Sequence, residues 1–521
     1  LLRVPDSITI DALIEDKVAT GNWKEHLGKS PSSLVNSSTW ALLVTGKLLK
    51  DSEEKHFGAT VKSLIKRLGE PVIRTAVAQA MKELGRQFVL GRTIKEATEN
   101  ARSMEKRGYT YSYDMLGEAA RTDQDALRYH KAYSDAISEL AKVCNSTDIR
   151  KNPGISVKLS ALHPRYEVPQ RERVINELVP RTLSLALQAK EANMGFNIDA
   201  EEADRLDLSL DVIYKILSDP RLEGWDGLGV VVQAYGQRCA HVLDWLYATA
   251  KELDRKIMVR LVKGAYWDAE IKRAQTMGLN GFPVYTRKVH SDLSYISCAE
   301  KLLKMTDQIY AQFATHNAHS VSAIRFMAAK FNVDHFEFQR LHGMGESLHD
   351  TVLSADKTRC RIYAPVGAHR DLLAYLVRRL LENGANSSFV NQIVDKSIPA
   401  SFIAKDPFKE VEKENGQFIN TKIAQPSLLF GHKRRNAKGW DITDPVELER
   451  LLSARTIYQK QQWNAFPMLA IDVDSGQNMQ HPIINPADPK DIVGFYREAS
   501  PLEIKSAIEN AKTAFTSWSS T

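Results

Sequence analysis

The chain has 521 residues, which is longer than one ordinary domain. Hydrophobic residues make up 43% and charged residues 26%, so a packed globular core is expected. The formal net charge of +6 is mild for this length and does not suggest a dedicated nucleic-acid binder, although a basic surface would weakly favour anionic lipid.

The cysteines and the apolar runs indicate where the protein works. Four isolated cysteines without a CxxC pair fit a reduced cytoplasmic compartment better than a disulfide framework. No apolar run approaches the roughly 18 residues of a spanning helix, and we expect no signal peptide. The first residue is Leu rather than Met, so we expect the chain to be a fragment of a longer protein.

The first part of the chain, residues 1 to about 107, has the periodicity of helices. Residues 61–68 and 72–84 carry apolar side chains at helical spacing, with glycine and proline between the two runs. Residues 93–106 form a charged helical run that ends before Gly108. No strong strand pattern occurs in this part.

In the middle of the chain, short β-branched or aromatic runs alternate with longer amphipathic runs such as 174–192, 205–217, 241–253 and 321–329. Eight such units over about 280 residues predict a TIM barrel. The alternative is a doubly wound open sheet, but no glycine-rich dinucleotide loop follows the first strand. The eight predicted strands are 109–116, 155–159, 195–199, 229–234, 257–262, 308–314, 335–341 and 361–366.

Side-chain alternation within the strands supports the barrel. Over residues 155–159 the apolar side chains take one face, and Ser156 and Lys158 take the other. Asn197 and Asp199 again share a face of the next strand. The polar faces would point into the barrel and the apolar faces would pack against the outer helices.

The predicted fold is therefore α/β, a (βα)8 TIM barrel with an N-terminal helical arm and an irregular C-terminal tail. Near the end of the chain, Ser500-Pro501-Leu502-Glu503 forms a capping box with proline at the first helical position. The expected boundaries are a helical arm at 1–54, a helical domain at 55–107, the barrel at 108–394, a linker at 395–470 and a separate C-terminal part at 471–521.

Polar residues collect where the predicted strands end, which is the rim at which barrel enzymes place catalysis. Any single position could instead be a satisfied lumen residue or a rim salt bridge. As a set, these residues indicate a ligand site. They are Glu118, Lys158, Asp199, Gln233, Arg260, Lys263, His316, Asn317, Gln339 and Tyr363.

The last barrel helix adds a second cluster. Tyr375, Arg378, Arg379 and Glu382 share one helical face, and leucines occupy the other. Adjacent arginines on a barrel helix commonly form a solvated face. Here the neighbouring rim favours a clamp in which both guanidinium groups and Lys158 bind the carboxylate of a small amino acid.

Other motifs are weaker. Gly28-Lys29-Ser30 ends like a phosphate loop, but Trp23 stands where its first glycine is required. A barrel metallohydrolase is the rival enzyme, and a non-catalytic barrel scaffold is the plainest alternative. We expect no metal, since the rim arginines and lysines would repel a cation. The potential metal ligands are His316, His319, His342, His369 and Asp199.

Five motifs together resemble the flavoprotein proline dehydrogenase family, in particular the bacterial proline utilization A group. They are residues 112–118 (SYDMLGE), 197–202 (NIDAEE), 261–267 (LVKGAYW), 314–317 (ATHN) and 375–384 (YLVRRLLENG). The resemblance covers essentially the whole chain and implies a distorted barrel.

At its C-terminal end, Pro482-Ile483-Ile484-Asn485-Pro486 is similar to the opening of an aldehyde dehydrogenase domain. Residues 471–521 would then be the truncated start of that domain, whose cofactor domain and nucleophilic cysteine are absent. We therefore expect the second activity to be lost. The ribbon-helix-helix DNA-binding region of some members is also absent, so no nucleic-acid partner is expected.

The resemblance implies a role for each substrate-site residue. Arg378, Arg379 and Lys158 would hold the carboxylate of L-proline. Glu118 and Asp199 would be the acids that set the arginines and the lysine. The ring pocket would be walled by Leu341, Tyr363 and Tyr375.

The family's cofactor is FAD, and Arg260 would lie near its N5 atom. The flavin would take a hydride from C5 of proline, so no side-chain nucleophile is needed, and the product would be Δ1-pyrroline-5-carboxylate. Electrons would then pass to ubiquinone at the membrane surface, which implies a cytoplasmic, peripherally membrane-associated enzyme and leaves self-association open. The expected FAD-lining residues are Asp199, Gln233, Arg260, Lys263, Gly264, Tyr266, Thr286, His316, Asn317, Gln339 and Glu382.

Overall fold

The computed structural model describes residues 88–356, 358–368, 372–384, 399, 401, 404–414, 416–459, 461–469 and 480–521. The expectations for the helical arm, for most of the helical domain and for Gly28–Ser30 lie outside the described residues. The side chain of Glu382 lies outside them too. The chain divides into two compact units after Thr443, and each is described by itself.

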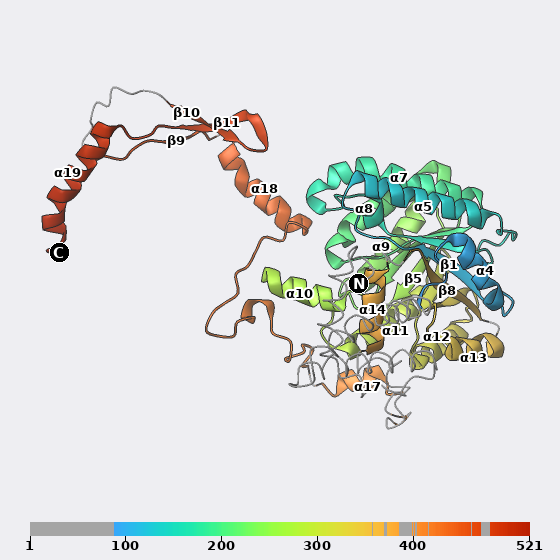
Figure 1. Ribbon diagram of the computed structural model, residues 1–521. Helices are drawn as coiled ribbons and strands as arrows, with labels where there is room; N and C mark the ends of the chain where they lie inside the picture. The colour runs from blue at the N-terminus through green and yellow to red at the C-terminus, as the bar shows by residue number, and fades with distance from the viewer. Residues whose placement is uncertain are drawn as a thin grey trace, which may run out of the picture. The chain divides into compact units, whose positions relative to one another are not determined.

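Eight parallel strands close into a barrel in chain order (Figure 1). Strand β1 pairs with both β2 and β8, so the sheet has no free edge. All eight strands lie within about three residues of the predicted ranges, and the α/β barrel is confirmed. Their bounds are β1 Thr110–Met115, β2 Gly154–Val157, β3 Gly195–Ile198, β4 Leu228–Gln233, β5 Ile257–Val262, β6 Ile309–Ala314, β7 Phe336–Leu341 and β8 Arg359–Val366.

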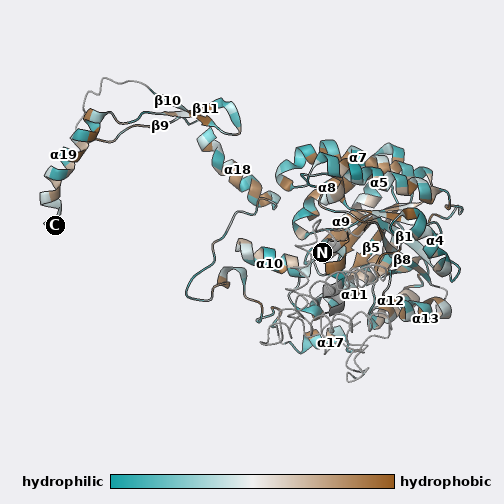
Figure 2. Ribbon diagram, viewed as in Figure 1, coloured by the Kyte–Doolittle hydropathy of each residue, from teal (hydrophilic) through white to brown (hydrophobic). Residues whose placement is uncertain are grey.

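Helices surround the strands, and their outer faces are hydrophilic whereas the strands are largely hydrophobic (Figure 2). Side-chain caps start several of them: the Thr122 side chain accepts a hydrogen bond from the backbone N–H of Asp125 at the first turn of α5. None of the helices in the described ranges is long and apolar enough to cross a bilayer. The helices of the barrel unit are α4 Ile94–Glu105, α5 Asp123–Ala141, α6 Leu159–Leu162, α7 Arg171–Glu191, α8 Leu206–Leu217, α9 Cys239–Glu252, α10 Trp267–Met277, α11 Lys288–Leu303, α12 Ala318–Phe331, α13 Glu346–Asp356, α14 Leu373–Gly384 and α17 Pro407–Glu412.

Hydrogen bonds across the lumen confirm the predicted alternation. The hydroxyls of Ser112 on β1 and Ser156 on β2 lie 2.9 Å apart, and both are buried. Across the barrel, Asn197 Nδ2 donates to Gln312 Oε1 at 3.1 Å. The apolar side chains between these positions are buried against the helices. The lumen is therefore polar, and hydrogen bonds between strands hold several of its side chains in place.

A buried ion pair fills the half of the barrel where the strands begin. Arg361 Nε donates to Glu337 Oε1 at 2.8 Å, and both side chains are buried. Arg361 Nη2 also donates to Glu337 Oε2 at 3.3 Å, and Nη1 donates to the backbone carbonyls of Tyr111 and Asn152 at 3.0 Å. Because a buried charge without partners is costly, this pair ties β7 and β8 to the loop before β2.

The C-terminal unit contains α18 Pro445–Gln459, β9 Trp463–Ala465, β10 His481–Asn485, β11 Asp488–Tyr496 and α19 Pro501–Trp518. The strands form a sheet of order β10-β11-β9. Its capping box is confirmed, because Ser500 Oγ accepts from the N–H of Glu503 at 3.2 Å and the Ser500 N–H donates to Glu503 Oε2 at 2.8 Å. The unit begins earlier than residue 471, since β9 pairs with β11 and so draws part of the expected linker into this sheet.

Breaking the Arg361–Glu337 pair should destabilise the barrel. Arg361→Leu leaves the Glu337 carboxylate buried without its cation, and we expect a loss of about 3–5 kcal/mol in the free energy of unfolding. The double variant Glu337→Leu/Arg361→Leu should recover most of that loss, because it removes both charges. Guanidinium unfolding of the barrel, followed by tryptophan fluorescence, measures both. Equal losses in the single and double variants would show that shape rather than charge matters here.

Candidate active site

A cavity of about 380 Å³ lies at the ends of the barrel strands. Most residues that the sequence predicts for the site line it. Two of the described ones do not: Glu118 contacts the lining residue Arg378, and Thr286 lies elsewhere. The predicted residues that line the cavity are Lys158, Asp199, Gln233, Arg260, Lys263, Gly264, Tyr266, His316, Asn317, Gln339, Leu341, Tyr363, Tyr375, Arg378 and Arg379.

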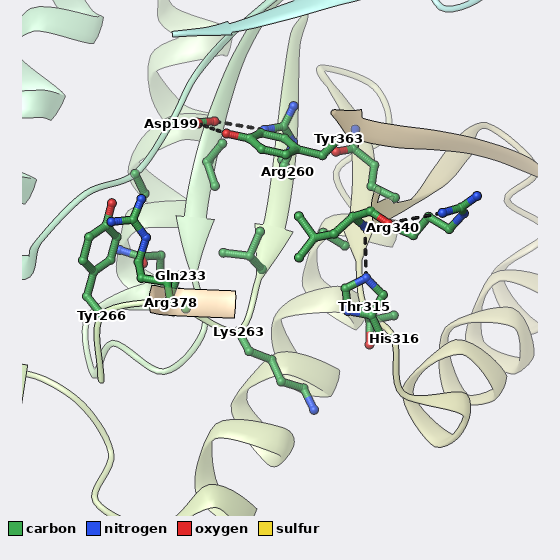
Figure 3. Close-up of a pocket in the computed structure, with 18 of the residues that line it drawn as sticks. Asp199, Gln233, Arg260, Lys263, Tyr266, Thr315, His316, Arg340, Tyr363 and Arg378 are labelled. Carbon is green, nitrogen blue, oxygen red and sulfur yellow. Dashed lines mark hydrogen bonds and ion pairs between the residues drawn. The ribbon is translucent and has the colours of Figure 1, made fainter. Parts of the chain in front are cut away.

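Asp199, which follows β3, is the centre of the cavity floor (Figure 3). Its Oδ2 accepts a hydrogen bond from the Tyr363 hydroxyl at 2.7 Å and one from Lys158 Nζ at 3.3 Å. Its Oδ1 accepts from Arg260 Nη1 at 3.0 Å. The Arg260 guanidinium carbon lies 5.3 Å from the centroid of the Tyr363 ring. One carboxylate thus fixes side chains from β2, β5 and β8.

Lys158 stands just after β2, at the start of α6, and its ammonium group is enclosed. Its Nζ donates to Asp114 Oδ1 at 2.7 Å, and it also lies 3.3 Å from the Tyr363 hydroxyl. Burial disfavours the charged amine, but the carboxylates of Asp114 and Asp199 outweigh burial and raise the pKa of Lys158 well above its ordinary value. Lys158 therefore stays protonated in this environment.

The Arg378 guanidinium is held flat at the cavity wall. Its Nη1 and Nη2 donate to the two carboxylate oxygens of Glu118 at 2.8 and 2.7 Å. Its central carbon lies 5.0 Å from the Tyr266 ring centroid, and Figure 3 shows the two side chains face to face. Burial opposes ionisation of Glu118, but the hydrogen bonds and charge of Arg378 lower the pKa of that carboxyl below its usual value. Glu118 thus orients this arginine, as expected.

The two arginines of α14 do not form a solvated face. The Arg378 side chain is 14% exposed, and Arg379 as a residue is 7% exposed. The Arg379 guanidinium carbon lies 5.2 Å from the centroid of the Tyr375 ring. Tyr375 belongs to one apolar cluster against which Leu341 and Tyr363 also pack. Buried cations therefore border an apolar wall, which suits a small ligand with an anionic end and a hydrocarbon ring.

Another part of the wall comes from the turn after β5. Gly264 has φ +133°, and a Cβ there would lie 2.6 Å from the Tyr235 ring, so only glycine fits. The turn directs Lys263 towards α11, where its ammonium pairs with Asp292 (Figure 3). Tyr266 then stands at the start of α10. The main chain comes close to the cavity here.

Histidines near the cavity serve as hydrogen-bonding groups. His316 Nε2 accepts a hydrogen bond from the backbone N–H of Leu341 at 3.0 Å. His349 bonds the Thr315 carbonyl oxygen at 2.9 Å, and burial lowers the pKa of its imidazole to about 4. Within the described ranges, no group of three or more His, Cys, Asp or Glu side chains could hold a metal ion. The metallohydrolase alternative gains no support.

Sequence reasoning missed Asp114 and Arg340. Asp114 is wholly buried and contacts Lys158, and its spacing of two from the lumen residue Ser112 was a usable signal. Arg340 lines the cavity at 2% exposure and donates to the carbonyls of Leu341 and Met344. Its position between the lumen residue Gln339 and Leu341 assigns it to the outer face, so alternation gave no signal.

Thr286, which the resemblance implies beside the cofactor, contacts a later segment of the chain. Its hydroxyl accepts a hydrogen bond from the backbone N–H of Asn420 at 3.0 Å, and Asn420 Nδ2 donates to its carbonyl oxygen at 3.3 Å. Nearby, Glu414 contacts both Arg287 and His290. Residues 404–443 are thus tied to the stretch between β5 and α11.

The family model described as proline dehydrogenase matches residues 97–392. The chain belongs to this family. "Bifunctional protein PutA" of Escherichia coli is 51% identical over 532 residues, covering 100% of this chain and 40% of that protein. A crystal structure of a Bradyrhizobium japonicum proline utilization A mutant is 47% identical, with a TM-score of 0.69 over 90% of this chain and 46% of that one. A structure of proline utilization A with proline bound in remote sites has 47% identity and a TM-score of 0.70 over the same shares.

The chain thus spans about 40% of the length of the curated PutA relatives it matches. A second family model, described as the DNA-binding domain of proline dehydrogenase, matches residues 1–88. This match stands against our expectation that a DNA-binding region is absent. The expectation of no nucleic-acid partner therefore loses its support for this part of the chain.

Beside the cavity, a buried carboxyl should make stability depend on pH. Burial is the largest influence on Glu201 and raises its pKa to about 7, and its Oε2 accepts from the Ser160 N–H at 3.0 Å. The folded chain then binds this proton more tightly than the unfolded chain, so stability should fall as pH rises from about 4.5 to about 7.

In Glu201→Gln, the decrease in the free energy of unfolding between about pH 4.5 and about 7 should be smaller by about 1–3 kcal/mol. Urea unfolding at several pH values measures it. Glu270, whose pKa burial also raises to about 7, remains in the variant as an internal reference. An unchanged slope between pH 5 and 8 in Glu201→Gln would contradict the assignment.

Proposed function

We propose that this chain oxidises L-proline to Δ1-pyrroline-5-carboxylate with FAD bound across the barrel mouth. The observation that carries the proposal is the pair of buried arginines on α14 beside an apolar wall. A carboxylate would meet Arg378 and Arg379, and a five-membered ring would rest against Leu341, Tyr363 and Tyr375. The family membership and the names of the relatives support the same substrate.

The cavity residues fit a flavin. Arg260, Lys263 and Lys288 line it, and cations favour both the phosphates of FAD and the anionic reduced ring. Two buried atoms that face no partner within the described ranges, Arg260 Nε and Gln339 Oε1, belong to lining side chains. A donor and an acceptor of this kind suit the polar edge of an isoalloxazine. Bound FAD would supply the hydride acceptor.

The protein's own part is binding and positioning. Two hydrogen bonds to Glu118 fix the orientation of the Arg378 guanidinium. The side chain is therefore already ordered before a substrate carboxylate binds to it. Asp199 fixes Arg260 and Tyr363 in the floor beneath the ring. The apolar wall excludes water, which strengthens the ion pairs and protects the reaction from hydrolysis.

Ubiquinone at the membrane surface is the proposed electron acceptor. This would be a peripheral contact, and its support is the family resemblance alone. The curated relatives are called bifunctional, so a second activity belongs to those longer proteins and is not proposed for this chain.

Mixing the FAD-containing protein with L-proline without oxygen should bleach the visible absorbance of the oxidised flavin. The reason is that the cation-lined cavity stabilises the reduced, anionic ring. D-proline and L-alanine serve as controls for the shape of the pocket. A flavin that stays oxidised under excess L-proline would refute the proposed function.

Arg379→Met should raise the KM for proline by about tenfold or more, since a charge-assisted contact to a carboxylate contributes about 1.5–3 kcal/mol. The variant should remain folded and yellow. Arg128→Met is a matched control, because Arg128 also lies over a tyrosine ring, at 4.7 Å from Tyr129, but on the outer helix α5. Steady-state kinetics, a flavin spectrum and a melting curve are needed for both. A KM within about twofold of wild type in well-folded Arg379→Met would mean that the clamp is misassigned.

A further inference from the structure

Below the cavity floor lies a carboxylate to which no role has been given. Asp114 is on β1, inside the barrel, and is wholly buried. It pairs in register with Ser156 on β2 and with Pro365 on β8, so it sits where the closing strands meet. Asp114 is not among the residues that line the cavity. Any influence on a ligand must therefore pass through another side chain.

That side chain is Lys158, which does line the cavity. An ammonium group has three protons, and Lys158 Nζ has three oxygen neighbours. Asp114 Oδ1 is the shortest contact at 2.7 Å, whereas Asp199 Oδ2 and the Tyr363 hydroxyl are each 3.3 Å away. Asp199 and Tyr363, which make the two longer contacts, line the cavity, whereas Asp114, which makes the short contact, does not. Asp114 thus sets the position from which Lys158 reaches that surface.

Charge counting points the same way. The floor holds two cations, Lys158 and Arg260, and Asp199 by itself would face both of them. Burial raises the pKa of Asp114, but the Lys158 ammonium at 2.7 Å favours its charged form, and as a carboxylate it gives the group two anions for two cations. Without Asp114, Lys158 would have Asp199 as its only carboxylate partner in this group and would compete with Arg260 and Tyr363 for the Asp199 oxygens.

We propose that Asp114 is a positioning residue for proline oxidation. It anchors the Lys158 ammonium from below, so that Lys158 points at the carboxylate end of the cavity while Asp199 remains available to Arg260 and Tyr363. This inference rests on the proposed function, since the reaction is its readout.

The test is a double-mutant cycle in the FAD-containing protein with proline as substrate. Asp114→Asn keeps the shape and one acceptor oxygen but removes the charge, and should raise the KM for proline about tenfold with a smaller change in kcat. Lys158→Met should raise the KM by at least as much. Because Asp114 acts through Lys158, the double variant should resemble Lys158→Met within about twofold.

A matched control is Asp350→Asn. Asp350 lies on the outer helix α13 and forms an ion pair with Arg107, so its loss should leave the KM for proline and kcat unchanged. If Asp114→Asn alone folds poorly, the double variant still decides the question, because it removes both charges of the buried pair. Effects that multiply in the double variant, or an unchanged KM in folded Asp114→Asn, would overturn the inference. If wild type does not reduce its flavin with proline, the proposed function fails instead, and flavin reduction is therefore measured first.

Discussion

Ionised side chains inside a closed barrel must neutralise one another, because little water reaches them, and this constraint shapes the whole site. Arg361 and Glu337 form a pair where the strands begin. Asp114 and Asp199 balance Lys158 and Arg260 further along the lumen. At the rim, Glu118 balances Arg378. Each acid therefore determines where a neighbouring cation can lie.

This arrangement explains how a barrel can present several buried cations to one small ligand although buried, unpaired charges are unfavourable. The hydrogen bonds that satisfy the acids also fix the side chains that face the cavity. The backbone contributes at the turn after β5, where Gly264 allows the chain to come close to Tyr235. The stretch between β5 and α11 is supported from outside by residues 404–443, for example through the ion pair of Arg273 with Asp441.

Much of the fold was readable from the sequence because strand and helix periodicities differ. Alternation assigned Ser156, Lys158 and Asn197 to the lumen, and the structure agrees. Helical spacing placed the arginine pair on one face, and the neighbouring rim favoured a carboxylate clamp over a solvated face. The burial of both arginines could not be read from the sequence, because it depends on contacts between distant parts of the chain.

The misses have physical causes. Alternation along β7 places the Arg340 side chain on the outer face of the barrel, yet it is buried because its guanidinium donates to backbone carbonyls just after it in the chain. Thr286 was expected near the cofactor from the family resemblance, and no local signal in the sequence indicates its contact with Asn420, which lies far along the chain. The C-terminal unit begins before the expected residue 471 because β9 pairs with β11, and pairing between separate strands leaves no local signal in the sequence.

The central claim is that one cavity binds FAD and the carboxylate of proline at the α14 arginines. A crystal structure with FAD and a five-membered cyclic carboxylic acid that lacks the ring nitrogen, and so resists oxidation, tests it most directly. The claim predicts the carboxylate within hydrogen-bonding distance of Arg378 and Arg379, and the ring between the flavin and the wall of Leu341, Tyr363 and Tyr375. A carboxylate bound elsewhere, with both arginines facing only protein, would contradict it.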